Sequence, residues 1–250
     1  MTKLPHTTTK PTLLRPTALL ISALVFSASA HAGFEQCPQF FAQGKPPVVQ
    51  PKPMQRELCY SAFAILHSGS TKTPVFVAQR LDRDSVADAD EKRTNKFFAD
   101  ARLPSAERAT LDDYKNSGYS RGHQAAAGDM PNATAMAQSF SLANMVPQDQ
   151  GHNGGPWSKV EQDTRKYASR AKGAVFVITG PVFTADSPSI GSNKVKVPTY
   201  LFKLVYDEDR AKAWVHWQEN RSGKQDARPI SYRELVERTG INFLPAAQVK

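Results

Sequence analysis

The stretch from Tyr119 to Glu161 constrains the fold of this chain more than any other part of its sequence. A strand-like segment around Arg121 and His123 comes first, a loop follows, and a Gly-Gly-Pro turn then leads into a helical pattern. Residues two apart on an extended strand point to the same face, so Arg121 and His123 are predicted to face one ligand. Asn153 directly precedes the Gly-Gly-Pro turn and is predicted to lie at a helix N-terminus, where anions are favoured.

The polar residues of this stretch suit the cleavage of a phosphodiester. An unperturbed imidazole titrates close to neutral pH, so His123 is a candidate general base. The guanidinium of Arg121 is a planar fork of donors that matches phosphate oxygens. Asn153 carries a hard amide oxygen of the kind that Mg²⁺ accepts. Glu161 lies about two helical turns further on, near enough to hold a water on that metal.

Each of these residues also has a simpler interpretation. A single histidine is more often structural or at the surface than catalytic, and Arg-Gly-His alone carries little information. Asn153 before Gly-Gly-Pro is equally typical of a turn and a helix cap. The combination in this order and spacing is far less easily produced by chance. His152, next to Asn153, is expected to be a solvent-exposed residue at a loop tip and not a second catalytic histidine.

Three motifs together resemble the DNA/RNA non-specific endonuclease family, which belongs to the ββα-metal, or His-Me finger, nucleases. The motifs are Arg-Gly-His-Gln at 121–124, Asn-Met-Val-Pro-Gln at 144–148, and Asn153 with Trp157 and Glu161. The resemblance runs from about Pro74 to about Pro245.

In that family the histidine is the general base and the asparagine is the only direct protein ligand of one Mg²⁺. The resemblance therefore implies these roles for His123 and Asn153. It also implies that Glu161 holds water on the metal and that Arg121 contacts phosphate. Other divalent cations such as Mn²⁺ are compatible with the same site.

The chain departs from the family pattern at two positions. Ser120 stands where the motif usually begins with Asp, a residue expected to support the loop and not the chemistry. Gly154 stands where Gln is common. An upstream arginine also belongs to the family site, and Arg93 is the best match. Three other arginines lie nearby in the sequence: Arg80, Arg83 and Arg102. Asn144 is expected to organise the loop that faces the site, and Asp129 to orient the motif loop.

The first 32 residues have the features of a secretory signal. The basic residues of its n-region are Lys3, Lys10 and Arg15. A mostly apolar run follows over 17–29, and Ala30-His31-Ala32 fits the small-x-small cleavage pattern. The run is too short to span a bilayer comfortably, so a membrane anchor is the less favoured alternative. We expect a mature chain of residues 33–250, secreted or periplasmic, with no membrane contact after cleavage.

A mature chain of this length is sufficient for one sizeable core and does not require two domains. Removal of the signal takes three basic and no acidic residues, so the formal net charge falls from +9 to +6. A basic exported protein suits a polyanion, because neutralised phosphates release counterions. Charge alone does not establish this, since many secreted proteins are basic. Export also makes a disulfide between Cys37 and Cys59, the only two cysteines, the default expectation.

The remaining pattern predicts an α+β domain, a ββα-metal core with a central antiparallel sheet flanked by helices. Strands are expected over 74–81 and 174–183, with a hairpin formed by 198–206 and 212–217. Helices are expected over 156–173 and from the capping box at Ser231 to Gly240, and either a short helix or a loop over 136–143. The charged segment 82–113 lacks a clear core face and is expected to cross the surface and deliver Arg93 to the site.

Three functions from different classes fit these observations. The favoured one is a sugar-non-specific endonuclease that addresses the phosphate backbone of DNA and RNA, with a possible inhibitor protein as a further partner. A catalytically weak nucleic-acid-binding protein on the same scaffold is supported only by Ser120. A phosphodiesterase for small exported substrates is the third. The oligomeric state is left open.

Overall fold

The computed structural model describes residues 1, 2, 4, 33–226 and 228–250. The predicted signal lies almost wholly outside the described residues. From residue 33 onward, the described chain forms one compact unit. No helix among the described residues is both long and apolar enough to cross a membrane.

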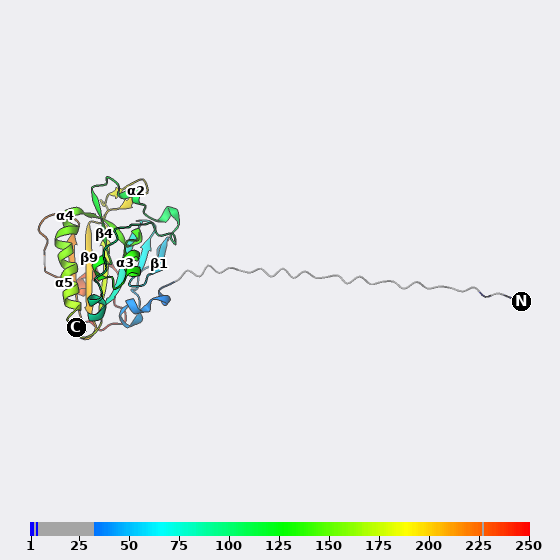
Figure 1. Cartoon of the computed structure of the whole chain (residues 1–250), viewed down its shortest axis with the longest axis horizontal. Coiled ribbons are helices and arrows are strands. Elements are labelled where there is room, and N and C mark those ends of the chain that lie inside the picture. The colour runs from blue at the N-terminus through cyan, green and yellow to red at the C-terminus, as the bar shows by residue number, and fades with distance from the viewer. Residues whose placement is uncertain (3, 5–32, 227) are drawn as a thin grey trace. The chain divides into compact units, whose positions relative to one another are not determined.

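A six-stranded antiparallel sheet forms the centre of the protein, with strand order β1-β2-β3-β6-β9-β10 (Figure 1). Its strands are β1 (Gln55–Cys59), β2 (Ala64–Ser68), β3 (Thr73–Leu81), β6 (Val175–Val182), β9 (Tyr200–Asp207) and β10 (Lys212–Glu219). The interior strand β6 is rich in β-branched residues and buried along nearly its whole length, as a strand covered on both faces must be. The predicted strands over 74–81 and 174–183 and the hairpin that follows them are confirmed by β3, β6 and the β9–β10 pair.

One face of the sheet is covered by the N-terminal turns and the C-terminal helix. The elements are η1 (Phe34–Gln36), η2 (Pro38–Phe40), η3 (Ala42–Gly44) and α6 (Tyr232–Thr239). Aromatic rings dominate this core, including Phe34, Phe41, Phe76, Phe202 and Phe243. The Ser231 hydroxyl accepts a hydrogen bond from the Glu234 N–H, and Gly240 ends α6 with a φ of 69°. The predicted start and stop of this helix are thus confirmed.

The opposite face carries a β-hairpin and two helices. The hairpin pairs β4 (Tyr119–His123) with β5 (Met145–Asp149), and the helices are α3 (Ala133–Ser139) and α5 (Ser158–Ala168). Ala168 of α5 packs against Val177 and Val205 of the sheet, and Figure 1 shows α5 running beside β9. The chain is therefore layered as turns and α6, sheet, then hairpin with α3 and α5.

One expectation about a helix needs correction, and the segment 82–113 contains more structure than expected. The helix predicted to end at Gly173 ends at Ala168, because the chain must turn back to enter β6 at Val175. The segment 82–113 runs over the surface as expected, with exposed residues along its whole length, but its second part also contributes to the core. Its second part contains η4 (Ser105–Glu107) and α2 (Leu111–Tyr114), and it buries Leu103 and Ala109. The region over 136–143 is helical at its start, within α3, and continues into η6 (Leu142–Asn144).

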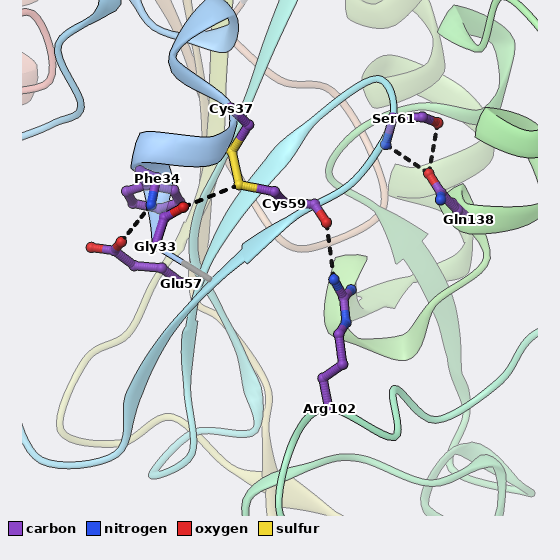
Figure 2. The surroundings of a disulfide bond; sticks show 8 residues. All are labelled: Gly33, Phe34, Cys37, Glu57, Cys59, Ser61, Arg102 and Gln138. Carbon is purple, nitrogen blue, oxygen red and sulfur yellow. Dashed lines mark hydrogen bonds between the residues drawn. A yellow bond between two sulfur atoms is a disulfide. The ribbon is translucent and has the colours of Figure 1, made fainter. Parts of the chain in front are cut away.

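The disulfide between Cys37 and Cys59 is present, which confirms the prediction (Figure 2). It ties η2 to the end of β1. The Glu57 carboxylate accepts a hydrogen bond from the Phe34 N–H at 2.7 Å, and Arg102 donates to the Cys59 carbonyl at 2.9 Å. The N-terminal turns are therefore held to β1 by the disulfide and by the Phe34–Glu57 hydrogen bond, while Arg102 fixes the end of β1 from another segment.

Candidate active site

The hairpin and the following helix form a strand–strand–helix unit on one face of the sheet. In the hairpin Arg121 lies opposite Pro147 and His123 opposite Met145. The chain then passes through α4 (Gln150–His152) and the wide turn η7 (Asn153–Trp157) into α5. This order, two antiparallel strands followed by a helix, is the ββα arrangement expected from the sequence.

Gly122 is required in the middle of Arg-Gly-His because a side chain lies directly over it. A Cβ atom at this position would approach the Oε1 of Gln148 to 2.0 Å. The Nε2 of Gln148 donates in turn to Nδ1 of His152 at 2.9 Å, and Nε2 of His152 donates to Oε1 of Gln218 at 2.9 Å. His152 is therefore fully buried, and the expectation of a solvent-exposed histidine is wrong. The cause is α4, which is capped by Asp149 and turns the imidazole inward.

His123 sits in an aromatic pocket with only 6% of its surface exposed. Its ring centroid lies 5.1 Å from that of Phe140 and 5.9 Å from that of Phe97. Its Nε2 is enclosed and makes no hydrogen bond with the described residues, whereas Nδ1 is not enclosed. Burial and then the positive charge of Arg93 lower the pKa of His123 to about 3, well below that of an unperturbed imidazole.

Two guanidinium groups flank the same aromatic pocket. The Cζ of Arg121 lies 4.1 Å from the centre of the Phe97 ring, and the Cζ of Arg93 lies 5.1 Å from the centre of the Phe140 ring. Arg121 and His123 thus contact the same Phe97 ring, in keeping with their spacing on one strand.

The other upstream arginines are engaged elsewhere. Arg80 pairs with Asp82 at 2.6 Å, Arg102 pairs with Asp100 at 2.7 Å, and Arg83 donates to the Ser169 carbonyl. Arg93 is exposed, and it alone among the four influences the charge of His123. The placement favours Arg93 as the upstream arginine of the site.

Asn153 is the first residue of η7 and is half-buried. Its side chain makes no hydrogen bond with the described residues. It does not open a helix as expected, because the short turn α4 precedes it and its own φ and ψ are helical, −59° and −48°. The break comes at Gly155, with φ −108° and ψ −106°. The argument from a helix N-terminus therefore does not apply to Asn153.

The donor set fits a metal that keeps most of its water. No group of three or more His, Cys, Asp or Glu in the described part of the chain is arranged to hold a metal ion. The unpartnered amide oxygen of Asn153 is a hard neutral donor, and Mg²⁺ commonly uses one or two protein oxygens together with water and substrate oxygens. A carboxylate-rich Ca²⁺ cage or a His/Cys zinc site does not fit these residues.

Glu161 lies on α5, half-buried, without a hydrogen bond or ion pair to the described residues. Burial raises the pKa of Glu161 to about 7, opposed by the positive charges of Lys203, Arg165 and Arg93 and reinforced by the negative charge of Asp129. Arg93 therefore acts on both Glu161 and His123, which places all three in one electrostatic neighbourhood.

Lys203 was missed in the sequence. It lies in the middle of β9 with 1% of its surface exposed, and its Nζ donates to Thr179 Oγ1 at 2.9 Å. The available signal was a single lysine at 203 inside the apolar strand pattern Tyr-Leu-Phe-Lys-Leu-Val-Tyr. Phe97 and Phe140 were missed as well, because nothing local in the sequence links them to His123.

Asn144 and Asp129 connect the elements around the site. The Asn144 side chain accepts from the Ala125 N–H at 2.8 Å and donates to the carbonyls of Ala125 and Ser139 at 2.9 Å each. It thereby fixes the chain just after His123. Asp129 pairs with Arg165 of α5 at 2.8 Å, which joins the loop after the motif to the helix that carries Glu161.

Comparison with known proteins extends the match beyond the three motifs. A profile described as DNA/RNA non-specific endonuclease matches residues 47–250. The mitochondrial nuclease EXOG of Xenopus laevis is 33% identical over 157 residues, which cover 58% of this chain and 44% of that protein. The human mitochondrial endonuclease G is 32% identical over 155 residues, which cover 58% of this chain and 52% of that protein. The chain thus spans about half the length of the curated relatives it matches.

A solved structure shares the fold. A chain from the crystal structure of the EndoG/EndoGI complex aligns with a TM-score of 0.70 and 25% sequence identity. The alignment covers 81% of this chain and 96% of that one. The layered sheet and the strand–strand–helix unit described above are therefore features of an established nuclease architecture.

Proposed function

The chain belongs to the DNA/RNA non-specific endonuclease family, and on this premise we propose that it hydrolyses internal phosphodiester bonds of both DNA and RNA. The observation that carries the proposal is the aromatic pocket of Phe97 and Phe140, which brings His123 together with the guanidinium groups of Arg121 and Arg93. One base and two phosphate-binding cations thus border one surface. A Mg²⁺ ion held by Asn153 would neutralise charge on the phosphate and on the departing oxygen.

His123 acts as the general base in this proposal. With a pKa of about 3 it is neutral at physiological pH, and its unenclosed Nδ1 is the nitrogen able to accept a proton from the attacking water. For proton transfer to be favourable, the proton affinity of His123 must rise when the substrate binds. A substrate phosphate paired with Arg93 offsets the repulsion that this cation exerts on the imidazolium, so the bound substrate raises the proton affinity of His123.

Arg121 and Arg93 bind the phosphate from two sides of the pocket. Contacts of this kind address the backbone and not the base edges, so weak sequence preference and tolerance of both sugars follow. A weak binding protein, based on Ser120, and a small-substrate phosphodiesterase are the alternatives. Ser120 lies opposite Gln148 in the intact hairpin register, which supports a hairpin that forms without the family aspartate.

We further propose that the protein is exported, with residues 1–32 removed as a signal. The relatives include proteins named as mitochondrial, so the two destinations are distinguished by experiment. Mass spectrometry of the protein from the producing cells should find an N-terminus at Gly33 in the periplasm or the medium. An intact N-terminus inside the cell would overturn export.

The nuclease proposal is tested with purified residues 33–250 on supercoiled plasmid and on long RNA, with Mg²⁺ or with EDTA. We expect both substrates to be cut internally with Mg²⁺ and neither with EDTA. The His123→Ala variant should lose at least about a hundredfold in rate, a general-base contribution, and still bind DNA. Cleavage of a chromogenic diester without cleavage of the long polymers would favour the small-substrate phosphodiesterase. Binding without any cleavage would favour the weak binding protein.

The solved structure of similar fold is a complex of EndoG with EndoGI, determined to explain the inhibition of EndoG. We propose that a protein inhibitor of this chain would cover the surface that carries Arg93 and Arg121, over the buried His123. Arg93 is exposed there, so an acidic inhibitor surface would find a charged partner without any rearrangement of the sheet.

A further inference from the structure

A cleft of about 460 Å³ lies next to the candidate active site, between β4 and the end of α2. Arg121 of β4 and Lys115, which follows α2, both line it. The guanidinium of Arg121 also lies over the Phe97 ring that contacts His123. Arg121 therefore belongs to both surfaces, and a polynucleotide bound at His123 would continue into the cleft.

The backbone of Arg121 faces away from β5. Asn220 donates to the Pro147 carbonyl at 3.0 Å and accepts from the Asp149 N–H at 2.8 Å, so these backbone groups point outward from the hairpin. Their register partners on β4 are Arg121 and Tyr119. Because opposed residues of an antiparallel pair either bond to each other or both point outward, the Arg121 N–H lies on the free edge of β4. It makes no hydrogen bond with the described residues and is open to a ligand.

Several polar side chains that line the cleft have no partner within the described part of the chain. Lys115, Ser120 and Arg121 make no side-chain hydrogen bond or ion pair there, and Lys115 is exposed. Tyr114 is 5% exposed, and its enclosed hydroxyl also lacks a hydrogen-bond partner. Two cations line the cleft against a single acid, Asp112, so the cleft favours an anion.

Tyr119 marks where this favourable charge ends. It lines both the cleft and a second hollow of about 500 Å³. In the second hollow Arg221 is paired with Glu219, and Asp186 adds a further negative charge, so another phosphate would be repelled there. The half-buried Tyr119 ring is an aromatic surface on which a base can stack. The cleft is therefore suited to one nucleotide and not to a longer stretch.

We propose that this cleft is a subsite for the single nucleotide that adjoins the scissile bond on one side. Lys115 and the Arg121 N–H bind the phosphate of that nucleotide, and Tyr119 stacks on its base. The inference rests on the proposed nuclease function and deepens it, because it gives the substrate a preferred form. A base reaches a side chain in a cleft only when it leaves its own stack, so single strands of DNA or RNA use the subsite and an intact duplex does not.

Binding without cleavage measures the phosphate contact. Fluorescence anisotropy in EDTA follows a labelled single-stranded oligothymidylate on residues 33–250 over a range of salt concentrations. Lys115→Gln should lower the slope of log affinity against log salt by about 0.7, the value for one phosphate on a single strand. Lys45→Gln is the matched control, because Lys45 is also exposed, has no side-chain partner among the described residues, and follows η3 on the opposite face of the sheet. It should leave the slope unchanged.

Trinucleotides locate the contact. With Mg²⁺, cleavage of each bond of a thymidine trinucleotide is compared with cleavage of the same bond when the other phosphate is a neutral methylphosphonate. In one of the two modified isomers, and not in the other, kcat/KM of the wild type should fall by about fivefold at 0.1 M salt. In Lys115→Gln this loss should nearly disappear, because the charge that the phosphate meets is already absent.

The stacking contact is tested at Tyr119. Tyr119→Leu should weaken binding of the oligothymidylate by at least about fivefold, the effect of losing one stacked base, and Tyr119→Phe, which keeps the ring, should restore most of the affinity. If Tyr119→Leu does not fold by circular dichroism, an abasic residue in place of the flanking base makes the same test on the wild type.

The outcomes are distinct. Equal salt slopes for the wild type and Lys115→Gln, or an equal methylphosphonate effect in both proteins, would overturn the subsite while the nuclease activity of the wild type stands. A wild type whose binding depends on Lys115 and Tyr119 as expected, but that cuts neither DNA nor RNA, would overturn the proposed function and leave the nucleotide-binding cleft intact.

Discussion

Burial of His123 against Phe97 and Phe140 lowers the affinity of its imidazole for a proton. The sequence predicts the histidine, its arginine and the asparagine, because these lie in short motifs. The low pKa of His123 and the raised pKa of Glu161 depend on residues far away in the chain, from Arg93 to Lys203. A motif specifies which groups are present, but the dielectric around them is decided by tertiary packing, which local patterns do not contain.

The raised pKa of Glu161 predicts a dependence of stability on pH. The group titrates at about 7 in the folded protein against an ordinary value of 4.5. The folded state therefore holds the proton more strongly, and this contribution to stability is present below pH 4.5 and lost as pH rises through about 7. Glu161→Gln should be more stable than the metal-free wild type at pH 8 by roughly 1–3 kcal/mol. The difference should shrink toward pH 5.

Urea unfolding in EDTA at the two pH values measures this difference. A gap between variant and wild type that is equal at pH 5 and pH 8 would show that Glu161 is not perturbed in the folded protein.

The Asn153→Ala and Arg121→Ala variants should lose nuclease activity for different reasons. Asn153→Ala removes the only protein ligand proposed for Mg²⁺, so added Mg²⁺ should restore part of the rate. Arg121→Ala removes a charge-assisted contact worth roughly 1.5–3 kcal/mol, which added Mg²⁺ should not replace. Rate against Mg²⁺ concentration at matched DNA distinguishes them. If both variants saturate at the wild-type midpoint, Asn153 is not a metal ligand.

The β4–β5 hairpin holds the candidate site residues Arg121 and His123, and part of its structure could be predicted from the sequence. The two-residue spacing of Arg121 and His123 was sufficient to predict a strand that presents both to one surface. The start of the following helical segment was not predictable. Asp149 caps the short turn α4, which directly precedes Asn153, and the break in helical backbone falls at Gly155. The length of α5 was overestimated, since side-chain periodicity continues where the backbone has already turned.

Gly122→Ala should damage this hairpin through one contact. The added methyl meets Gln148 Oε1 at 2.0 Å, and Gln148 moves only by breaking its bond to the buried His152. We expect a loss of about 1–3 kcal/mol in the free energy of unfolding, as for overpacked sites. Gly154→Ala is the control, because a Cβ there meets no atom within 4 Å. Equal stability of the two variants would argue against the contact.

At the scale of the whole molecule, the class of fold was predictable and the order of its strands was not. Each strand shows its own pattern, but β3 lies beside β6 only because residues nearly a hundred positions apart pair across the sheet. The surface course of the segment 82–113 was expected, whereas the burial of Leu103 and Ala109 depends on packing against residues far away in the chain. Long-range packing of this kind has no signature in a single sequence.

The disulfide should contribute to global stability and not to chemistry. Cys37 and Cys59 are 22 residues apart, and a crosslink closing a loop of this size stabilises by about 3 kcal/mol. Cys37→Ser combined with Cys59→Ser should lower the unfolding free energy by that amount. The wild type, denatured without reductant, should show no free thiols in a thiol titration. Two titrating thiols would contradict the bond.

The buried hydrogen bonds from Gln148 through His152 to Gln218 can be donated in only one direction. An amide nitrogen only donates, so Nδ1 of His152 must accept, and its proton must sit on Nε2 facing the Gln218 oxygen. The same orientation leaves the other end of the Gln148 amide, its oxygen, above Gly122. The tautomer of one enclosed imidazole thus dictates which atom overhangs the middle residue of Arg-Gly-His. A proton on Nδ1 would set two donors against each other and favour rotation of the Gln148 amide. Burial lowers the pKa of His152 and so also preserves the contact of Gln148 over β4.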